Sequence, residues 1–244
     1  MNTDSSSLTI VIPCYNEEAC IVSTLTELRR NMPEAQIVAV NDGSSDRTLE
    51  LLRGIDDTGL VVLNIPFNSG IGVAVQTGLI YAARHGAGRA VKFDADGQHP
   101  AREIPRLLEA IDNGADFVIG SRFVDGTTGF RSYFMRRIGI RFFRLLIAVT
   151  TGGSVTDATS GFRAYGREAL LFAARNYPAF DYPEPEECIL FLRNKFKVEE
   201  IPCNMSERQG GRSSIRALKS VYYMLKVSFA MIMESVRPRI RKGI

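Results

Sequence analysis

The chain has 244 residues and a mass of 27.0 kDa, with 45% hydrophobic and 23% charged residues, a composition that excludes disordered, collagen-like and coiled-coil proteins. The formal net charge of +3 is unevenly distributed. Residues 1–120 carry 9 Lys and Arg against 16 Asp and Glu, a charge of −7, and residues 121–244 carry 21 against 11, a charge of +10. The second half is therefore a candidate surface for an anionic partner.

Short β-branched runs alternate with longer helical patterns through the first half of the chain. The expected strands are residues 8–13, 37–41, 61–65, 90–94 and 117–120, and the expected helices are residues 17–31, 46–55, 70–85 and 101–113. Apolar strands joined by crossover helices predict an α/β fold with a mostly parallel central sheet and helices on both faces. No Pro/Gly/Ser-rich linker divides the chain, so we expect a single domain over residues 1–244.

Polar clusters follow three of these strands, at residues 13–17, 41–46 and 94–100. Because ligands bind beyond the carboxyl ends of parallel strands, the clusters predict a binding site there. The second cluster is also explained as a turn in which Asp46 caps the next helix. Asp94 and Asp96 repel each other unless a cation or hydrogen-bond donors balance them, and hard divalent cations use such oxygen ligands.

The order of the motifs resembles the inverting glycosyltransferases of family 2, which have the GT-A fold. The resemblance spans residues 8–214 and is carried by Val-Ile-Pro-x-Tyr-Asn-Glu-Glu at 11–18, Val-Asn-Asp-Gly-Ser-Ser-Asp at 40–46, Asn-Ser-Gly at 68–70, Asp-Ala-Asp-Gly-Gln at 94–98, Gly-Ser-Arg at 120–122 and Asp-x-x-Ser-Gly-Phe-Arg at 157–163. It implies a nucleotide-sugar-binding half at about residues 1–120, an acceptor half at about 121–214, and a C-terminal amphipathic helix with a basic tail at about 215–244.

Within this family the chain is most similar to the polyprenyl-phosphate sugar synthases, the dolichol-phosphate mannose synthase group. Gln98 follows the Asp-x-Asp motif, and residues 208–213 are similar to the Arg-x-x-Gly-x-Ser acceptor loop of that group. Ser214 is a departure, because relatives often carry a basic residue there.

The resemblance implies a nucleotide-sugar donor, and charge developing on its leaving diphosphate requires a cation. Asp94, Asp96 and Gln98 offer oxygen ligands that suit Mg²⁺ or Mn²⁺ better than zinc. His99 either belongs to this site or is a helix-entry residue. The residues expected to bind the donor are Pro13, Tyr15, Glu17, Asp42, Asn68, Asp94, Asp96 and Arg122. Asp42 would accept hydrogen bonds from the base. Arg122 would clamp a phosphate, or else cap a strand at the surface.

The acceptor decides whether the reaction needs a base. A lipid phosphate is ionised near pH 7 and can attack the anomeric carbon directly, whereas a sugar hydroxyl must lose a proton. The residues expected to bind an acceptor phosphate are Arg131, Arg163, Arg208, Arg212 and Ser213, and those expected to be catalytic are Asp96, Asp157 and Arg163. Asp157 acts as a base or orients Arg163. Glu184 or Glu186 is the alternative carboxylate, unless these acids form a solvated helix start.

Residues 133–149 show the pattern of a basic amphipathic helix. Its four arginines, Arg136, Arg137, Arg141 and Arg144, fall within an arc of about 140°. The apolar residues assigned to the opposite side are Phe134, Ile138, Phe142, Leu145, Leu146 and Val149. Such a helix lies in a membrane interface or docks on the protein core. Residues 218–236, followed by a basic tail, repeat the pattern.

The chain's location follows from its cysteines and its hydropathy. Cys14, Cys20, Cys188 and Cys203 lack zinc or redox spacing, and no signal segment is present at the N-terminus. We therefore expect a cytoplasmic protein, peripheral on the cytoplasmic face of a membrane. No stretch is apolar enough to span the bilayer, so a separate membrane-spanning partner protein is plausible.

The sequence thus predicts a metal-dependent hexosyltransferase that moves a sugar from a GDP-mannose or UDP-glucose type donor to a polyprenyl or dolichyl phosphate, with no nucleic-acid partner. The first alternative is a family 2 enzyme acting on a glycan hydroxyl in cell-surface polysaccharide synthesis, and another is an inactive member that only binds a nucleotide or a partner. A dinucleotide-binding oxidoreductase is the third, because Gly70-Ile71-Gly72 opens a helix, although Val75 stands at the third glycine position.

Overall fold

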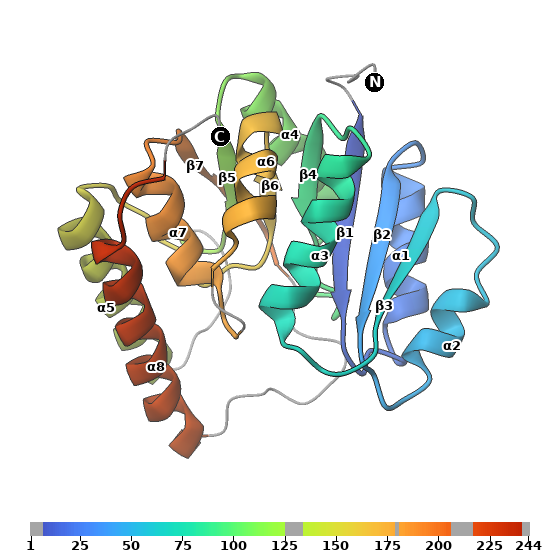
Figure 1. Ribbon diagram of the computed structural model, residues 1–244, viewed down its shortest axis with the longest axis horizontal. Coiled ribbons are helices and arrows are strands. Elements are labelled where there is room, and N and C mark those ends of the chain that lie inside the picture. Colours follow the sequence, from blue (N-terminus) through green and yellow to red (C-terminus); the bar gives the residue numbers. More distant parts are fainter. Residues whose placement is uncertain (1–6, 125–133, 179–180, 206–216, 241–244) are drawn as a thin grey trace.

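The computed structural model describes residues 7–124, 134–178, 181–205 and 217–240, and its described strands form one seven-stranded sheet (Figure 1). The strands are β1 (Leu8–Cys14), β2 (Gln36–Asp42), β3 (Leu60–Ile65), β4 (Arg89–Lys92), β5 (Phe117–Ser121), β6 (Arg163–Tyr165) and β7 (Val198–Pro202). Their order across the sheet is β3-β2-β1-β4-β6-β5-β7. Among them β6 alone is antiparallel to its neighbours β4 and β5, so the mostly parallel sheet is confirmed.

Helices cover both faces of the sheet, as the alternating pattern predicts. One face carries α1 (Ile21–Asn31), α2 (Thr48–Arg53) and α4 (Ile104–Asp112), which follows the short 3-10 helix η1 (Ala101–Glu103). The other face carries α3 (Ile71–Arg84), α6 (Arg167–Asn176) and α7 (Glu184–Arg193). Beyond α7, α5 (Phe134–Thr151) and α8 (Ala217–Val236) pack against it and against each other, at the end of the molecule opposite β3.

Two elements of the first half differ from the predicted boundaries for physical reasons. The helix predicted from residue 17 begins at Ile21, because the residues before it form a turn, in which the N–H of Cys20 bonds to the Glu17 carbonyl at 3.0 Å. Strand β4 ends at Lys92 and not at residue 94. The backbone N–H of Phe93 still bonds to β1, whereas that of Asp94 turns to a side chain of its own loop. Asp94 therefore lies in a loop.

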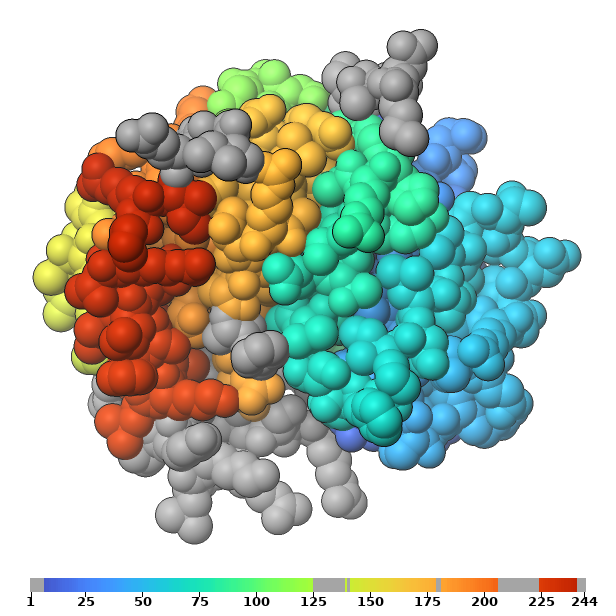
Figure 2. Space-filling model, in the orientation of Figure 1, coloured from blue at the N-terminus to red at the C-terminus, as the bar shows by residue number. Residues whose placement is uncertain are grey.

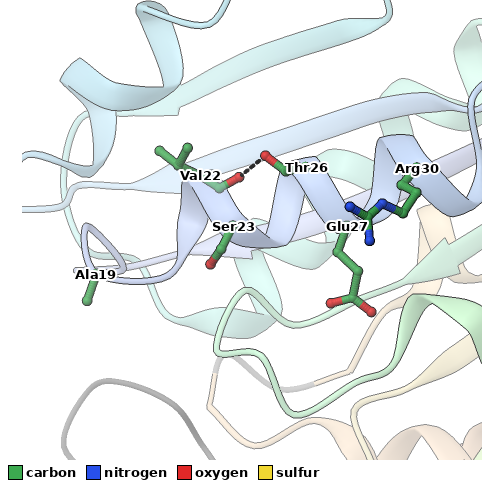
Figure 3. A pocket seen from close by; sticks show the side chains of 6 residues that line it. All are labelled: Ala19, Val22, Ser23, Thr26, Glu27 and Arg30. Carbon is green, nitrogen blue, oxygen red and sulfur yellow. Dashed lines mark hydrogen bonds between the residues drawn. The ribbon is translucent and has the colours of Figure 1, made fainter.

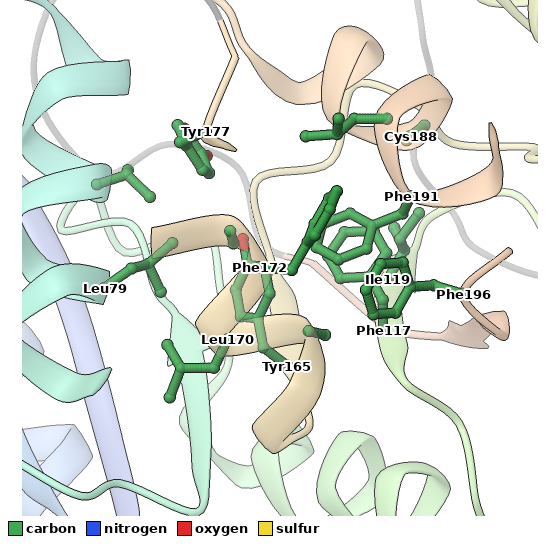
Figure 4. Close-up of a cluster of buried hydrophobic side chains, with 14 of the residues drawn as sticks. Leu79, Phe117, Ile119, Tyr165, Leu170, Phe172, Tyr177, Cys188, Phe191 and Phe196 are labelled. Atoms are coloured by element: carbon green, nitrogen blue, oxygen red, sulfur yellow. The ribbon is translucent and has the colours of Figure 1, made fainter. Parts of the chain in front are cut away.

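An aromatic cluster fixes α6 and α7 over β5 and β6 (Figure 4). The rings of Phe117 and Phe191 stack with centroids 4.3 Å apart, and Phe172, Phe196 and Tyr165 pack around Phe191. Aromatic pairs contribute about 0.5–1.5 kcal/mol each beyond their buried area. The same core includes Val11 of β1 and Leu79 of α3, so the half of the sheet predicted to serve the acceptor is packed continuously with the donor half.

Helix α5 buries a strip that borders both the predicted apolar side and the predicted basic side. Its buried residues Phe143 and Ile147 pack on the core. Phe142, Leu145 and Val149, on the predicted apolar side, are 42%, 62% and 75% exposed, and Arg141 and Arg144 are exposed as well. Most of the predicted apolar side therefore does not dock on the core, and its contact with a membrane interface stays a prediction. Among the described helices, none combines the length and the hydropathy that a bilayer span requires.

Candidate active site

The loops after β1 and β2 are tied together at the carboxyl edge of the sheet. The backbone N–H of Asn16 donates to Ser44 Oγ at 3.0 Å, and Asn16 Oδ1 accepts the N–H of Ser45 at 2.8 Å. The N–H of Glu17 donates to Thr48 Oγ1 at 2.8 Å. The first two predicted clusters therefore form one wall of the site.

Asp42 connects this wall to the loop after β3. Its two carboxylate oxygens accept the N–H groups of Ser69 and Gly70 at 2.8 and 2.9 Å. Gly43 has a φ of 62°, and a Cβ there would lie 2.5 Å from the Asn68 nitrogen, so the two loops are in direct contact. Gly70, which suggested a dinucleotide motif, is explained by its φ of 96° and by its bond to Asp42. Recognition of a base by Asp42 stays a prediction.

Two aromatic side chains in these loops are exposed to solvent. Tyr15, expected at the donor site, is 46% exposed, and Phe67 is 78% exposed. Pro13 and Glu17 are half-buried, and Asn68 is exposed. Sequence reasoning missed Phe67, although a large aromatic residue directly before Asn68 at a strand end was a usable signal. This edge therefore offers an open surface with flat apolar groups.

The loop after β4, residues 93–100, carries the predicted metal ligands. Asp96 is buried and its Oδ1 accepts the N–H of Gln98 at 3.1 Å, whereas the side chain of Asp94 is 26% exposed. Within the described part of the chain, no group of three or more His, Cys, Asp or Glu side chains could hold a metal ion. Mg²⁺ is usually held by one or two carboxylates together with substrate phosphates. The oxygen donors of Asp94, Asp96 and Gln98 suit such an ion chemically, and their binding of it together with a diphosphate stays a prediction.

Helix α1 braces this loop from outside the site. Thr24 Oγ1 donates to the carbonyl of Ala95 at 2.9 Å, and Glu27 accepts the N–H of Ala101 at 3.0 Å. Glu27 also lines a surface pocket of about 570 Å³ along α1 (Figure 3). The residues that line it are Ala19, Val22, Ser23, Thr26, Glu27 and Arg30, none of which is a predicted donor or metal residue.

Asp157 pairs with Arg122 in the interior. Its carboxylate accepts hydrogen bonds from Arg122 Nε and NH2, both at 2.7 Å, and from the Arg122 backbone at 3.0 Å. Burial by itself raises the pKa of Asp157, but the hydrogen bonds and the charge of Arg122 outweigh it and hold this pKa below its usual value. Asp157 therefore orients Arg122 and not Arg163. The surface interpretation of Arg122 was wrong, since Arg122 is 4% exposed.

Arg163 lies inside the protein. Its Nε donates to the Ser160 carbonyl at 2.9 Å, its NH2 donates to the Glu184 carbonyl at 2.8 Å, and its NH1 pairs with Glu187. Both members of that ion pair have no exposed side-chain area. In this geometry the guanidinium joins β6 to α7, and direct contact with an acceptor phosphate stays a prediction that this placement does not favour.

The acids at the start of α7 face inward, so the solvated-helix interpretation was wrong. Glu184 pairs with the fully buried Lys92, and Glu186 and Glu187 are buried. Tyr165 donates its hydroxyl to Glu187 at 2.8 Å. Sequence reasoning missed Lys92 and Glu187. A lysine two residues before Asp94 in an apolar strand was the available signal for the first.

Part of the predicted acceptor site lies outside the described residues. This applies to Arg131, Arg208, Arg212 and Ser213, which therefore stay predictions. Arg136 and Arg137 belong to α5, but their side chains are also outside the described set.

Comparisons with known proteins identify the family to which this sequence is similar. The model of the family described as Glycosyl transferase family 2 matches residues 9–172. A polyprenol monophosphomannose synthase of Mycolicibacterium smegmatis is 32% identical, covering 90% of this chain and 84% of that protein. An undecaprenyl-phosphate mannosyltransferase of Micrococcus luteus is 35% identical, covering 84% and 86%.

The fold has solved counterparts. Glucosyl-3-phosphoglycerate synthase of Mycobacterium tuberculosis, crystallised with Mn²⁺ and uridine diphosphate, superposes with a TM-score of 0.67 at 18% identity, covering 95% of this chain and 81% of that chain. This likeness shows the GT-A fold. Since the family model covers β1 to β6 and two relatives exceed 30% identity over most of their length, the chain belongs to glycosyl transferase family 2.

Proposed function

We propose that this protein transfers a hexose, with inversion, from a nucleotide sugar to a polyprenyl phosphate. The observation that carries the proposal is that the Asp94–Gln98 loop and the open loops after β1, β2 and β3 follow the same ends of neighbouring parallel strands in a family 2 sheet. The names of the two relatives support the acceptor class, since one is a polyprenol monophosphomannose synthase and the other an undecaprenyl-phosphate mannosyltransferase.

A phosphate acceptor agrees with the state of the carboxylates. Asp157, the expected base, is ionised but bound by Arg122, and Glu184 is bound by Lys92. A carboxylate held this way is poorly placed to take a proton from a sugar hydroxyl. An ionised phosphate needs no base, so this site suits it better than a glycan alcohol.

Asp94, Asp96 and Gln98 would hold Mg²⁺ or Mn²⁺, which neutralises charge on the leaving diphosphate when bound. Tyr15, Asn68 and the loop that Asp42 binds would line the pocket for the base and the ribose of the donor. Asp157 keeps the Arg122 guanidinium fixed at the end of β5. The structure with the same fold that holds Mn²⁺ and uridine diphosphate supports a metal ion and a nucleoside diphosphate as ligands of this site.

Gly161→Ala is expected to impair transfer with little effect on the fold. A Cβ at Gly161 would lie 2.3 Å from Asp94 Oδ2, so the carboxylate must move, and it can do so because it ends a side chain. A displacement of about 1 Å in a reacting site costs about 100-fold in rate. Nucleoside diphosphate release and the unfolding temperature measure the two effects. Gly54→Ala, where a Cβ meets only atoms at 3.5 Å, is the control; equal rates for both variants would contradict the prediction.

The acceptor places the enzyme at a membrane surface, and α8 has the side chains for it. Its exposed apolar side chains, which are 47–68% exposed, are Leu225, Phe229, Ile232, Met233 and Val236. The basic residues Arg141 and Arg144 are exposed on the neighbouring α5. Basic helices with an apolar side bind anionic lipid interfaces. All four cysteines are free and buried, which agrees with the reducing cytoplasmic face.

Two variants separate the apolar and the charged parts of this contact. Replacing Leu225 and Phe229 with Gln should weaken binding to anionic vesicles by roughly 3 kcal/mol or more at any salt concentration, because each buried side chain contributes about 1.5–3 kcal/mol. Replacing Arg141 and Arg144 with Gln should cost about 2 kcal/mol at low salt and much less at high salt. Vesicle flotation measures both; unchanged binding of both variants would show that these helices do not hold the membrane.

The function is tested by a donor and acceptor screen. Nucleotide release is measured with GDP-mannose, UDP-glucose and related donors, each with a polyprenyl phosphate, the matching polyprenol or a glycan alcohol. We expect release to depend on the phosphate. A glycan alcohol as the better acceptor would overturn the lipid-phosphate proposal.

A further inference from the structure

His99 turns both of its ring nitrogens toward one residue. Its Nδ1 accepts the backbone N–H of Asp94 at 3.1 Å, and its Nε2 lies 3.6 Å from Asp94 Oδ2. A ring nitrogen that accepts a backbone N–H carries no proton, so the proton of the neutral imidazole is on Nε2. The ring therefore turns this N–H toward the carboxylate of Asp94, at a separation slightly longer than a hydrogen bond. Hydrogen bonds in active sites are often long in the unliganded protein and shorten when the ligand binds.

The imidazole is held in this orientation by the Asp-x-x-Ser-Gly-Phe-Arg segment. Phe162 stacks on it with centroids 5.0 Å apart and an interplanar angle of 19°, and Phe93 contacts it edge-on at 5.6 Å. The neighbouring Gly161 lies against Asp94 Oδ2, where it leaves no room for a Cβ. One short segment thus fixes both the ring and the carboxylate.

We propose that His99 is a positioning residue that orients the Asp94 carboxylate for the metal through its Nε2–H. The inference rests on the proposed metal role of Asp94. Carboxylates that bind metals are commonly held by an outer hydrogen-bond partner, and loss of such a partner weakens metal binding about 10–100-fold. A neutral donor suits this position because it holds the carboxylate without a positive charge that would repel the cation.

Two conservative variants separate the two nitrogens. His99→Asn keeps an acceptor near the place of Nδ1 but has no donor at Nε2, whereas His99→Gln places an amide nitrogen near Nε2. We expect the Kd for Mn²⁺, measured by electron paramagnetic resonance with UDP or GDP present, to rise about 10–100-fold in His99→Asn. His99→Gln should stay nearer the wild type. His85→Asn changes the other histidine, which is exposed directly after α3, and should leave the Kd unchanged.

The outcomes are distinct. Wild-type Mn²⁺ affinity in His99→Asn would overturn the role of His99 and leave the metal assignment intact. Wild-type protein that binds no Mn²⁺ with either nucleotide would overturn the metal assignment and this role with it. A helix-entry role alone predicts lower thermal stability in both His99 variants with no change in Kd. If His99→Asn does not fold, Phe162→Leu removes the stacked ring instead, and an unchanged Kd there would overturn the proposal.

Discussion

Asp96→Ala should reduce transfer by about 1,000-fold or more, because the cation loses one of its two carboxylates and metal assistance contributes several kcal/mol to the barrier. The fold should lose little. The variant removes one hydrogen bond to the Gln98 N–H, worth about 1 kcal/mol, and also the repulsion between Asp94 and Asp96. Nucleoside diphosphate release and calorimetry measure the two effects.

Metal removal should reproduce this loss in the wild-type protein. Excess EDTA is expected to stop nucleotide release, and added Mg²⁺ or Mn²⁺ should restore it. The matched control for Asp96→Ala is Asp112→Ala, which removes a carboxylate paired with Arg89 at the surface and should keep full activity. Full turnover in excess EDTA would contradict the assignment of Asp94, Asp96 and Gln98 as metal ligands.

Arg163→Ala should lower the free energy of unfolding by about 3–5 kcal/mol, because it leaves the Glu187 carboxylate buried without its partner. Burial raises the pKa of Glu187, and Arg163 opposes that rise. Without Arg163 the pKa rises further. Protonation then removes the unpaired charge, so the loss should be largest at neutral pH and should shrink as the pH falls through the raised pKa. Urea unfolding at several pH values measures this.

The double variant Arg163→Met with Glu187→Leu should cost less than the sum of its single changes, since neither member of this pair is left as an unpaired buried charge. Its unfolding should also lose the pH dependence of Arg163→Ala. An Arg163→Ala protein with unchanged stability but a much higher KM for the acceptor would instead restore the predicted acceptor-phosphate role of Arg163.

Much of the donor half could be predicted from the sequence. The strand at 37–41 is buried and the edge strand at 61–65 is half-buried, and the continuous β-branched runs identify both. The polar clusters at their ends then have to meet at one edge. Asp94 and Asp96 could be placed near Asp42 for that reason, without knowledge of any side-chain contact.

The pairing of charges on the acceptor side could not be predicted. Arg163 and Asp157 share one motif, yet each pairs with a residue far along the chain or across the sheet. The choice of Glu187 for Arg163 and of Arg122 for Asp157 depends on β6 lying between β4 and β5. No local pattern encodes that strand order. Likewise, the buried side of α5 depends on how α7 and α8 pack.

The place of β6 has a consequence for synthesis on the ribosome. Strand β4 ends at Lys92 and its second neighbour begins at Arg163, so one edge of β4 stays open while the intervening residues are made. At about 5–20 residues per second this takes roughly 4–14 s. An open strand edge can pair with another chain, so the nascent protein passes through a period of aggregation risk. The loop after β4 also lacks its contacts with Gly161 and Phe162 until those residues have been made. A chain released before residue 163 should therefore not bind a metal ion and a nucleotide together tightly.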